Sequence, residues 1–158
     1  RRKKETQYGK QLREKQLARY MFGVSEKQFR MYYKKAARQD GITGNNLVRL
    51  LERRLDNVIY RAGFAATRPA ARQAATHGHF ILNGRRVDVP SIMVRPGDEI
   101  VIREKLQKTP IYEELSAVQG NWLEVDAKKK SIKVLNIPED DQLEKAVNSQ
   151  IIVEYYSR

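Results

Sequence analysis

The sequence contains no cysteine and only two histidines among its 158 residues. Without cysteine it can form neither disulfides nor thiolate-bound metal sites, which suits a reducing compartment. His77 and His79 have the only metal-like spacing, and no third ligand lies near them, so the sequence predicts no metal and no cofactor. No apolar run approaches the roughly 18 residues of a membrane-spanning helix. The first residues lead into polar sequence, which does not predict a secretory signal.

Positive charge is what the sequence has in excess. Lysine and arginine number 31 and acidic residues 19, so the net charge is +12. Such a charge draws a protein toward polyanions, whether nucleic acid or an anionic membrane surface. Residues 1–40 hold 13 basic and 4 acidic side chains, whereas residues 107–158 hold 7 and 9. We therefore expect residues 1–106 to supply the polyanion-binding surface.

Hydrophobic periodicity and capping signals predict helices through the first half of the chain. The expected ranges are residues 5–22, 26–39, 46–62 and 67–77. Ser25 and Gln28 have the spacing of a capping box, and Gly23 and Gly78 are suited to end helices. The apolar side of the first helix is expected to carry Tyr8, Leu12, Leu17, Tyr20 and Met21.

From residue 80 the pattern changes to the alternation that is typical of strands. Residues 80–82 and 85–87 flank the pair Asn83-Gly84, which readily takes two positive φ angles and predicts a tight hairpin. Later strands are expected at residues 99–103, 122–125 and 131–135, with a short helix at 110–118 and Trp122 in the core. The tail from residue 142 is expected to be helical, but its final apolar residues would also suit a strand.

Arginine is concentrated between residues 53 and 86. Arg68 and Arg72 are four residues apart and therefore share a helix face. A guanidinium stays charged and can bind two phosphate oxygens, and the helix start near Thr67 adds backbone N–H groups. Gly78 and Gly84 would let the backbone approach an RNA strand closely. This layout favours nucleic-acid binding, and the alternative is a solvated arginine face.

Two segments carry a family resemblance. The sequence TRPAARQAATHGHFILNGRRV (residues 67–87), continued by PGDEI (96–100), resembles the small RNA-binding module of ribosomal and RNA-modifying proteins. The flanking sequences LLERRLDNVIYRAGFA (50–65) and IVEYYS (152–157), with the basic helices before them, resemble bacterial small-subunit ribosomal protein four. This second resemblance covers essentially the whole chain.

The resemblance implies an α+β fold with two domains. In that family the N-terminal helices and the C-terminal tail form one domain, and the module is inserted between them. The implied domains are a mainly helical one, at residues 1–46 and 138–158, and an RNA-binding one of helices packed on a small antiparallel sheet, at 47–137. The core of the module is expected at 50–105. The family's N-terminal segment, which often holds a zinc site, has no counterpart here, and a start at Arg1 predicts a piece of a longer protein.

The function implied by the resemblance is structural rather than enzymatic. Family members are cytoplasmic constituents of the small ribosomal subunit that bind the 5′ domain of its RNA early in assembly. They also repress translation of their own operon and influence decoding accuracy. The implied partners are small-subunit ribosomal RNA, neighbouring small-subunit proteins and the protein's own messenger RNA. No membrane partner is implied, and the protein is expected to be a monomer outside the ribosome.

The resemblance also implies the RNA-binding residues. In the module they are Arg53, Arg54, Arg61, Arg68, Arg72, His77, Asn83 and Arg85. In the helical domain they are Lys3, Lys4, Tyr8, Lys10, Arg13, Lys34 and Lys35. An exposed solubilising role is the alternative for each charged residue. Tyrosines can stack on unpaired bases, but helical spacing favours core packing for most of those in the first two helices.

Other functions fit the sequence less well. An RNA-modifying enzyme can carry a similar module, but it needs a catalytic domain for which these residues leave no room. A DNA-binding protein would need a recognition helix or dimer symmetry, and neither is evident. A membrane-surface protein would need a broad apolar helix face, which the polar helices expected here lack. The adjacent carboxylates Glu113-Glu114 and Asp140-Asp141 fit helix starts or turns better than acid–base catalysis.

Overall fold

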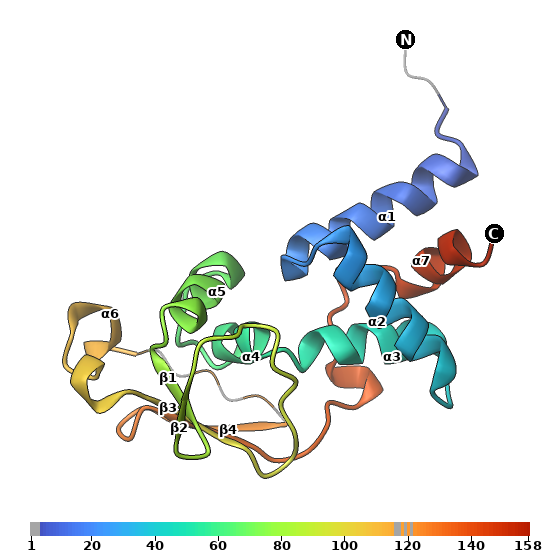
Figure 1. Cartoon of the computed structure of the whole chain (residues 1–158). Helices are drawn as coiled ribbons and strands as arrows, with labels where there is room; N and C mark the ends of the chain where they lie inside the picture. The colour runs from blue at the N-terminus through green and yellow to red at the C-terminus, as the bar shows by residue number, and fades with distance from the viewer. Residues whose placement is uncertain (1–3, 116–117, 119, 121) are drawn as a thin grey trace. The chain divides into compact units, whose positions relative to one another are not determined.

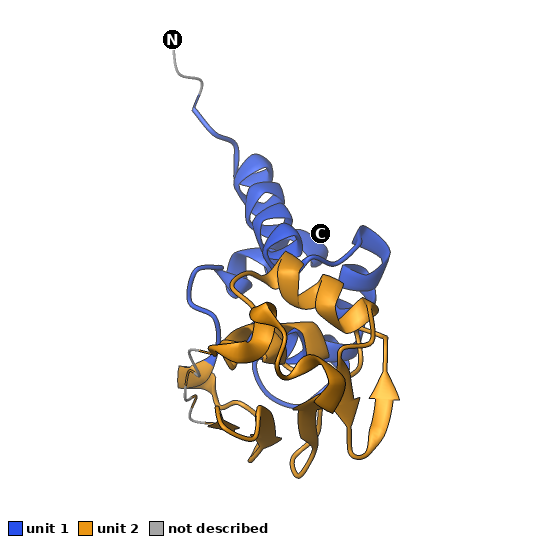
Figure 2. Cartoon of the chain, turned by 90° about the vertical axis from the view of Figure 1, so that its left-hand side faces the viewer, with its two compact units in different colours: residues 1–51, 143–158 blue, residues 52–142 orange. Residues whose placement is uncertain are grey.

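The structure is a computed structural model that describes residues 4–115, 118, 120 and 122–158 (Figure 1). The chain divides into two compact units, coloured separately in Figure 2. One comprises residues 1–51 and 143–158, and the other residues 52–142. Both junctions lie a few residues beyond the expected ones at 46 and 137. The α+β class is confirmed, because one unit is helical and the other contains a sheet.

The first unit is built from helices whose ends follow local signals. Its helices are α1 (Gln7–Phe22), α2 (Glu26–Arg38), nearly all of α3 (Thr43–Glu52) and α7 (Ser149–Tyr156). The predicted capping box is confirmed, since Ser25 Oγ accepts from the Gln28 amide at 3.2 Å and Gln28 Oε1 accepts from the Ser25 amide at 3.3 Å. Gly23 ends α1 with a φ of 68°, as predicted.

The inner side of α1 differs from the predicted one. Its buried residues are Gln11, Lys15, Ala18 and Phe22. Leu17 and Tyr20, predicted to be on the apolar side, are 42% and 70% exposed. The buried Lys15 ammonium lies 2.6 Å from Glu26 Oε1 and 4.6 Å from the ring centroid of Tyr155. These partners belong to α2 and α7, so the periodicity of α1 alone could not predict that polar residues face inward.

The C-terminal tail is a helix rather than a strand. Residues 140–142 form a short 3-10 turn, and α7 begins only at Ser149, later than predicted. Asn148 caps α7, because its Oδ1 accepts from the Ile151 amide at 3.3 Å. Ile152 is fully buried, and the rings of Tyr33 and Tyr156 stack with centroids 4.4 Å apart. The apolar tail therefore closes the helical unit by packing on its N-terminal helices.

The predicted helix 46–62 is divided into α3 and α4 (Leu55–Arg61). Arg54 between them has extended backbone, with a ψ of 143°. The backbone here pairs with residues 92–94: the Leu55 amide donates to the Ile92 carbonyl at 2.8 Å, and the Val94 amide to the Arg53 carbonyl at 2.9 Å. Long-range pairing thus replaces helical hydrogen bonds at this point. The apolar period runs through the break and gave no sign of it.

The second unit packs helices on an antiparallel sheet. Its strands are β1 (Phe80–Leu82), β2 (Arg85–Val87), β3 (Glu99–Ile102), β4 (Leu123–Asp126) and β5 (Ser131–Val134), in the spatial order β2-β1-β3-β5-β4. The Asn83-Gly84 hairpin is confirmed, since the two residues have φ angles of 50° and 82° and Leu82 pairs with Arg85. The remaining elements are α5 (Arg68–Thr76), η1 (Glu104–Leu106), α6 (Pro110–Glu113) and η2 (Asp140–Gln142).

One apolar core joins α4 and α5 to the sheet. It includes Val58, Ile59, Ala71, Ala75, Phe80, Ile100, Ile102 and Ile132, together with the predicted core residue Trp122. The helix predicted at 110–118 ends at Glu113, and residues 116 and 117 of that range lie outside the described residues. In the described part of the chain, no helix has the length and apolar character needed to cross a membrane.

Candidate nucleic-acid interface

A buried ion pair anchors the start of α4. Nε and Nη2 of Arg54 donate to Oδ1 and Oδ2 of Asp56 at 3.1 and 3.0 Å. Asp56 Oδ1 also accepts from the Asn57 amide at 2.7 Å. Arg54 is only 1% exposed. This corrects the prediction that Arg54 contacts RNA, because a side chain so deeply buried offers no surface to a partner.

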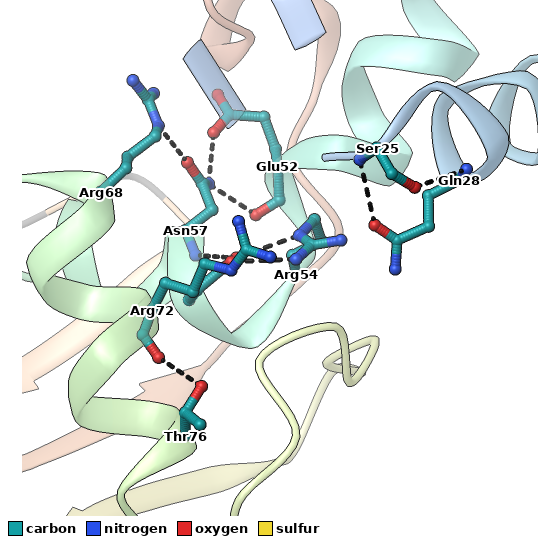
Figure 3. A network of polar contacts seen from close by, with 9 residues as sticks. Ser25, Gln28, Glu52, Arg54, Asn57, Arg68, Arg72 and Thr76 are labelled. Atoms are coloured by element: carbon teal, nitrogen blue, oxygen red, sulfur yellow. Dashed lines mark hydrogen bonds and ion pairs between the residues drawn. The ribbon is translucent and has the colours of Figure 1, made fainter. Parts of the chain in front are cut away.

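A second polar network connects α4 with α5. The carboxylate of Glu52, which is 1% exposed, accepts from Nε and Nη2 of Arg61 at 3.2 and 3.1 Å. Asn57 Nδ2 donates to Glu52 Oε1 at 2.6 Å, and Asn57 Oδ1 accepts from Arg68 Nε at 3.0 Å. Figure 3 shows Asn57 between Glu52 and Arg68. Glu52 and Asn57 thus hold two predicted RNA-binding arginines that come from different helices.

The guanidinium groups of this network reach the surface beside Tyr60. That of Arg68 lies 4.6 Å from the ring centroid of Tyr60, within the range of a cation–π contact. That of Arg61 lies 6.0 Å from the same centroid, and its side chain is 32% exposed. Arg72, one helical turn beyond Arg68, is exposed. The surface of α4 and α5 therefore presents Arg61 and Arg68, which Glu52 and Asn57 hold by hydrogen bonds, together with the exposed Arg72.

The hairpin adds exposed polar groups, and one of them has a structural task. Arg85 is exposed at the start of β2, and His77 is exposed after α5. Asn83 is also exposed, but its Nδ2 donates to Asp98 Oδ1 and its Oδ1 accepts from the Glu99 amide, both at 2.9 Å. Asn83 therefore joins the hairpin to the turn before β3.

Gly78 makes a close approach, but to a side chain of the same unit. Its φ is 72°, and a Cβ added there would lie 2.8 Å from Nε of Arg86. Arg86 Nε donates to the Gly78 carbonyl at 3.3 Å. Among the described residues, nothing lies within 4 Å of a Cβ built at Gly84. The two glycines expected to admit RNA thus differ, and only Gly84 is open.

Arg53 and His79 are only partly exposed, and each contacts a group of its own unit. Arg53 is half-buried, and its Nε donates to the Val94 carbonyl at 3.1 Å. His79 Nδ1 lies 2.8 Å from the Tyr112 hydroxyl. Partial burial lowers the pKa of His79, and the nearby charges of His77, Arg103 and Arg86 lower it further. A depressed pKa favours the neutral form of His79 in the folded protein.

In the helical unit, four of the predicted residues are exposed near the start of the chain. They are Lys4, Tyr8, Lys10 and Arg13. Arg13 pairs with Glu5 at 3.0 Å. The Tyr8 ring is contacted by the Arg158 guanidinium at 4.4 Å from its centroid. Lys3 lies outside the described residues.

The basic face of α2 is wider than the sequence analysis proposed. Lys34 and Lys35 are exposed, as expected of RNA-binding residues. Lys27, Arg30 and Arg38 are exposed on the same helix and were not among the predicted residues. The spacing of Lys27, Arg30, Lys34 and Arg38, by three or four residues, places them on one face and could have revealed them.

Among the described residues, no group of three or more His, Asp or Glu side chains is placed to hold a metal ion. The rings of His77 and His79 are 6.0 Å apart and meet edge to face. The arrangement supports electrostatic recognition of a polyanion. On α4 and α5, Arg61 and Arg68 are held by hydrogen bonds to Glu52 and Asn57.

Comparison with known proteins agrees with this architecture. Residues 53–100 match the S4 domain, and residues 1–52 match the N-terminal domain of ribosomal protein S4/S9. The chain is 51% identical over 162 residues to small ribosomal subunit protein uS4 of Pelotomaculum thermopropionicum, covering 99% of this chain and 78% of that protein. The protein of the same name from Rubrobacter xylanophilus is 48% identical over 160 residues, with coverages of 99% and 80%. The chain therefore belongs to the uS4 family of small ribosomal subunit proteins.

Proposed function

We propose that this protein is a structural, non-enzymatic constituent of the small ribosomal subunit that binds the 5′ domain of its RNA as a primary assembly protein. The observation that carries the proposal is the arginine surface of α4 and α5 within the matched S4 domain. Arg61 and Arg68 are held there by Glu52 and Asn57, and Arg72 lies on the same face as Arg68. Guanidinium groups held in this way are suited to paired phosphate oxygens.

The proposed mechanism separates affinity from specificity. Contacts to phosphates supply most of the affinity, and they do not depend on base sequence. Specificity comes from the shape of a folded RNA junction, because the grooves of RNA helices present little readable base sequence to side chains. Each unit supplies its own basic surface, α4 and α5 in one and α1 and α2 in the other. Binding then favours the native junction over other RNA folds by differential affinity.

Further roles belong to the same proposal. The protein binds neighbouring small-subunit proteins in the ribosome of the cytoplasm, and it is a monomer outside the ribosome. A surface that recognises RNA shape would also bind a messenger RNA that folds similarly, which supports repression of its own translation. An influence on decoding accuracy rests on the family resemblance alone.

The test is a binding comparison with the full chain. Dissociation constants are measured for the 5′ domain of small-subunit ribosomal RNA, for transfer RNA and for duplex DNA between about 50 and 200 mM salt. We expect a strong preference for the ribosomal fragment that persists as the salt concentration rises. Equal binding to all three, with a loss of roughly 10³-fold over that range, would reduce the protein to a nonspecific phosphate binder.

A further inference from the structure

Glu52 is a carboxylate placed beneath a cationic surface. By charge alone it should weaken the attraction of that surface for a polyanion. Yet both of its oxygens accept hydrogen bonds from Arg61, and Oε1 also accepts from Asn57 at 2.6 Å. The side-chain Nδ2 of Asn57 also donates to the backbone carbonyl of Glu52 at 2.7 Å. The carboxylate is thus enclosed by donors and aligned with one edge of a guanidinium.

We propose that Glu52 is a positioning residue for RNA binding, which acts by orienting the Arg61 guanidinium toward phosphate. Asn57 holds the Glu52 carboxylate in place and extends the same restraint to Arg68. This inference rests on the proposed RNA-binding function and deepens it. It assigns a role in RNA recognition to a buried acidic residue, which the sequence analysis did not include among the contacts.

The physical argument is preorganisation. A long arginine side chain loses rotamer freedom when it binds phosphate, and that loss weakens binding unless the side chain is already ordered. Two parallel hydrogen bonds that a guanidinium donates to one carboxylate fix both the position and the plane of the guanidinium. Arg61 keeps part of its side chain at the surface, at 32% exposure, while Glu52 is 1% exposed. The carboxylate therefore restrains Arg61 from the inside without itself reaching the RNA.

A purely structural role for Glu52 makes a different prediction. If the network only joins α4 to the start of α5, losing it should lower stability but should not affect RNA affinity through Arg61. The two roles separate in a double-mutant cycle, because a positioning effect disappears when the positioned side chain is absent. The sign of the change in affinity also separates positioning from charge.

The experiment measures the affinity of the full chain for the 5′ domain of small-subunit ribosomal RNA at fixed salt. The variants are Glu52→Gln, Arg61→Ala and the double variant, each checked for folding by thermal unfolding. Loss of a negative charge alone would tighten binding. We expect Glu52→Gln to weaken it by about 5- to 10-fold, and by no more than about 2-fold when Arg61 is already alanine.

Two further variants keep the test decisive. If Glu52→Gln does not fold, Glu52→Asp takes its place in the test. Glu52→Asp retains the charge but withdraws the carboxylate by one methylene, and we expect it also to weaken RNA binding. Glu124→Gln makes the same charge change at an exposed strand position away from the network, and we expect no loss of affinity. A loss as large in Glu124→Gln as in Glu52→Gln would overturn the inference.

The inference and the proposed function fail in different ways. If wild-type protein prefers the ribosomal fragment but Glu52→Gln binds it equally or more tightly, the inference is wrong and the function stands. The same holds if Glu52→Gln causes equal losses with and without Arg61, or if Arg61→Ala itself changes nothing. If wild-type protein shows no preference for the fragment, the proposed function fails, and the inference fails with it.

Discussion

Arg54 and Asp56 form an ion pair inside the second unit, with Nη2 of Arg54 3.0 Å from Oδ2 of Asp56 and side-chain exposures of 2% and 5%. The ion pair lies at the junction between α3 and α4. At this junction the backbone forms hydrogen bonds with residues 92–94. The ion pair thus stabilises the direction of the helix that carries Arg61. Arg54 therefore belongs to the scaffold, although the family resemblance implies RNA contacts for both Arg53 and Arg54.

Replacement of Arg54 by methionine should strongly destabilise the protein. The variant leaves Asp56 buried without its cation, and breaking a buried ion pair in this way costs about 3–5 kcal/mol. The free energy of unfolding, measured by urea denaturation with Trp122 fluorescence, checks the prediction. The double variant Arg54→Met/Asp56→Asn should recover part of the loss, because it leaves no buried charge. A cost below about 1 kcal/mol for Arg54→Met would contradict a buried, charged pair.

Removal of Arg68 and Arg72 from one face of α5 should weaken RNA binding without unfolding the protein. In Arg68→Ala/Arg72→Ala we expect affinity for the ribosomal fragment to fall by about 10-fold or more, since each arginine is proposed to contact phosphate. The slope of log K against log salt should become shallower by up to about 2.

The matched control for this pair is Lys128→Ala/Lys129→Ala, which removes the same charge from the exposed turn between β4 and β5. We expect the control to change affinity by about 2-fold or less, as long-range electrostatics alone would. Equal losses in both double variants, or no loss in the arginine variant while it remains folded, would show that the surface is misplaced.

Asn83 should matter for stability through both its backbone and its side chain. Its φ is 50°, a conformation that costs alanine about 1 kcal/mol, and its side chain bonds Asp98 and the Glu99 amide. We expect Asn83→Ala to lower the free energy of unfolding by about 2 kcal/mol. Asn83→Gly loses the hydrogen bonds but accepts the φ, so it should cost about half as much. Chemical denaturation of both variants measures the difference. Equal losses of unfolding free energy in the two variants would show that the positive φ of Asn83 makes no contribution.

The depressed pKa of His79 predicts a loss of stability in acid. Burial, assisted by His77, Arg103 and Arg86, lowers the folded-state pKa below its ordinary value of 6.5. The unfolded chain then binds a proton more readily than the folded one, so the contribution of His79 is present above about pH 6.5 and is lost as pH falls through the folded pKa. The free energy of unfolding should fall from pH 7.5 to 5.5 by more in wild-type protein than in His79→Gln. An equal or larger fall in the variant would contradict the shift.

Local chemistry accounts for the elements that the sequence predicted well. The Ser25 capping box, the Thr67 cap of α5 and the Asn83-Gly84 hairpin each depend on residues no more than three positions apart. Their hydrogen bonds and φ angles are therefore encoded in short stretches of sequence. The Thr67 cap and the hairpin lie within residues 67–87, the stretch that carries the resemblance to the RNA-binding module. The placement of most predicted RNA-binding residues at the surface follows from their polarity, while the contacts themselves remain predictions.

Tertiary structure decided the features that depend on distant partners. The division of the predicted helix 46–62 needs residues 92–94 beside it, and the burial of Lys15 in α1 needs Glu26 and Tyr155. In the same way, Arg54 is an interior residue because it pairs with Asp56 and the surrounding core shields both side chains from water. Its neighbour Arg53 stays partly exposed. The sequence by itself determined the helix caps, the hairpin and the family. Only the fold decided which arginines face solvent, because burial is set by what packs against a side chain and not by its neighbours along the chain.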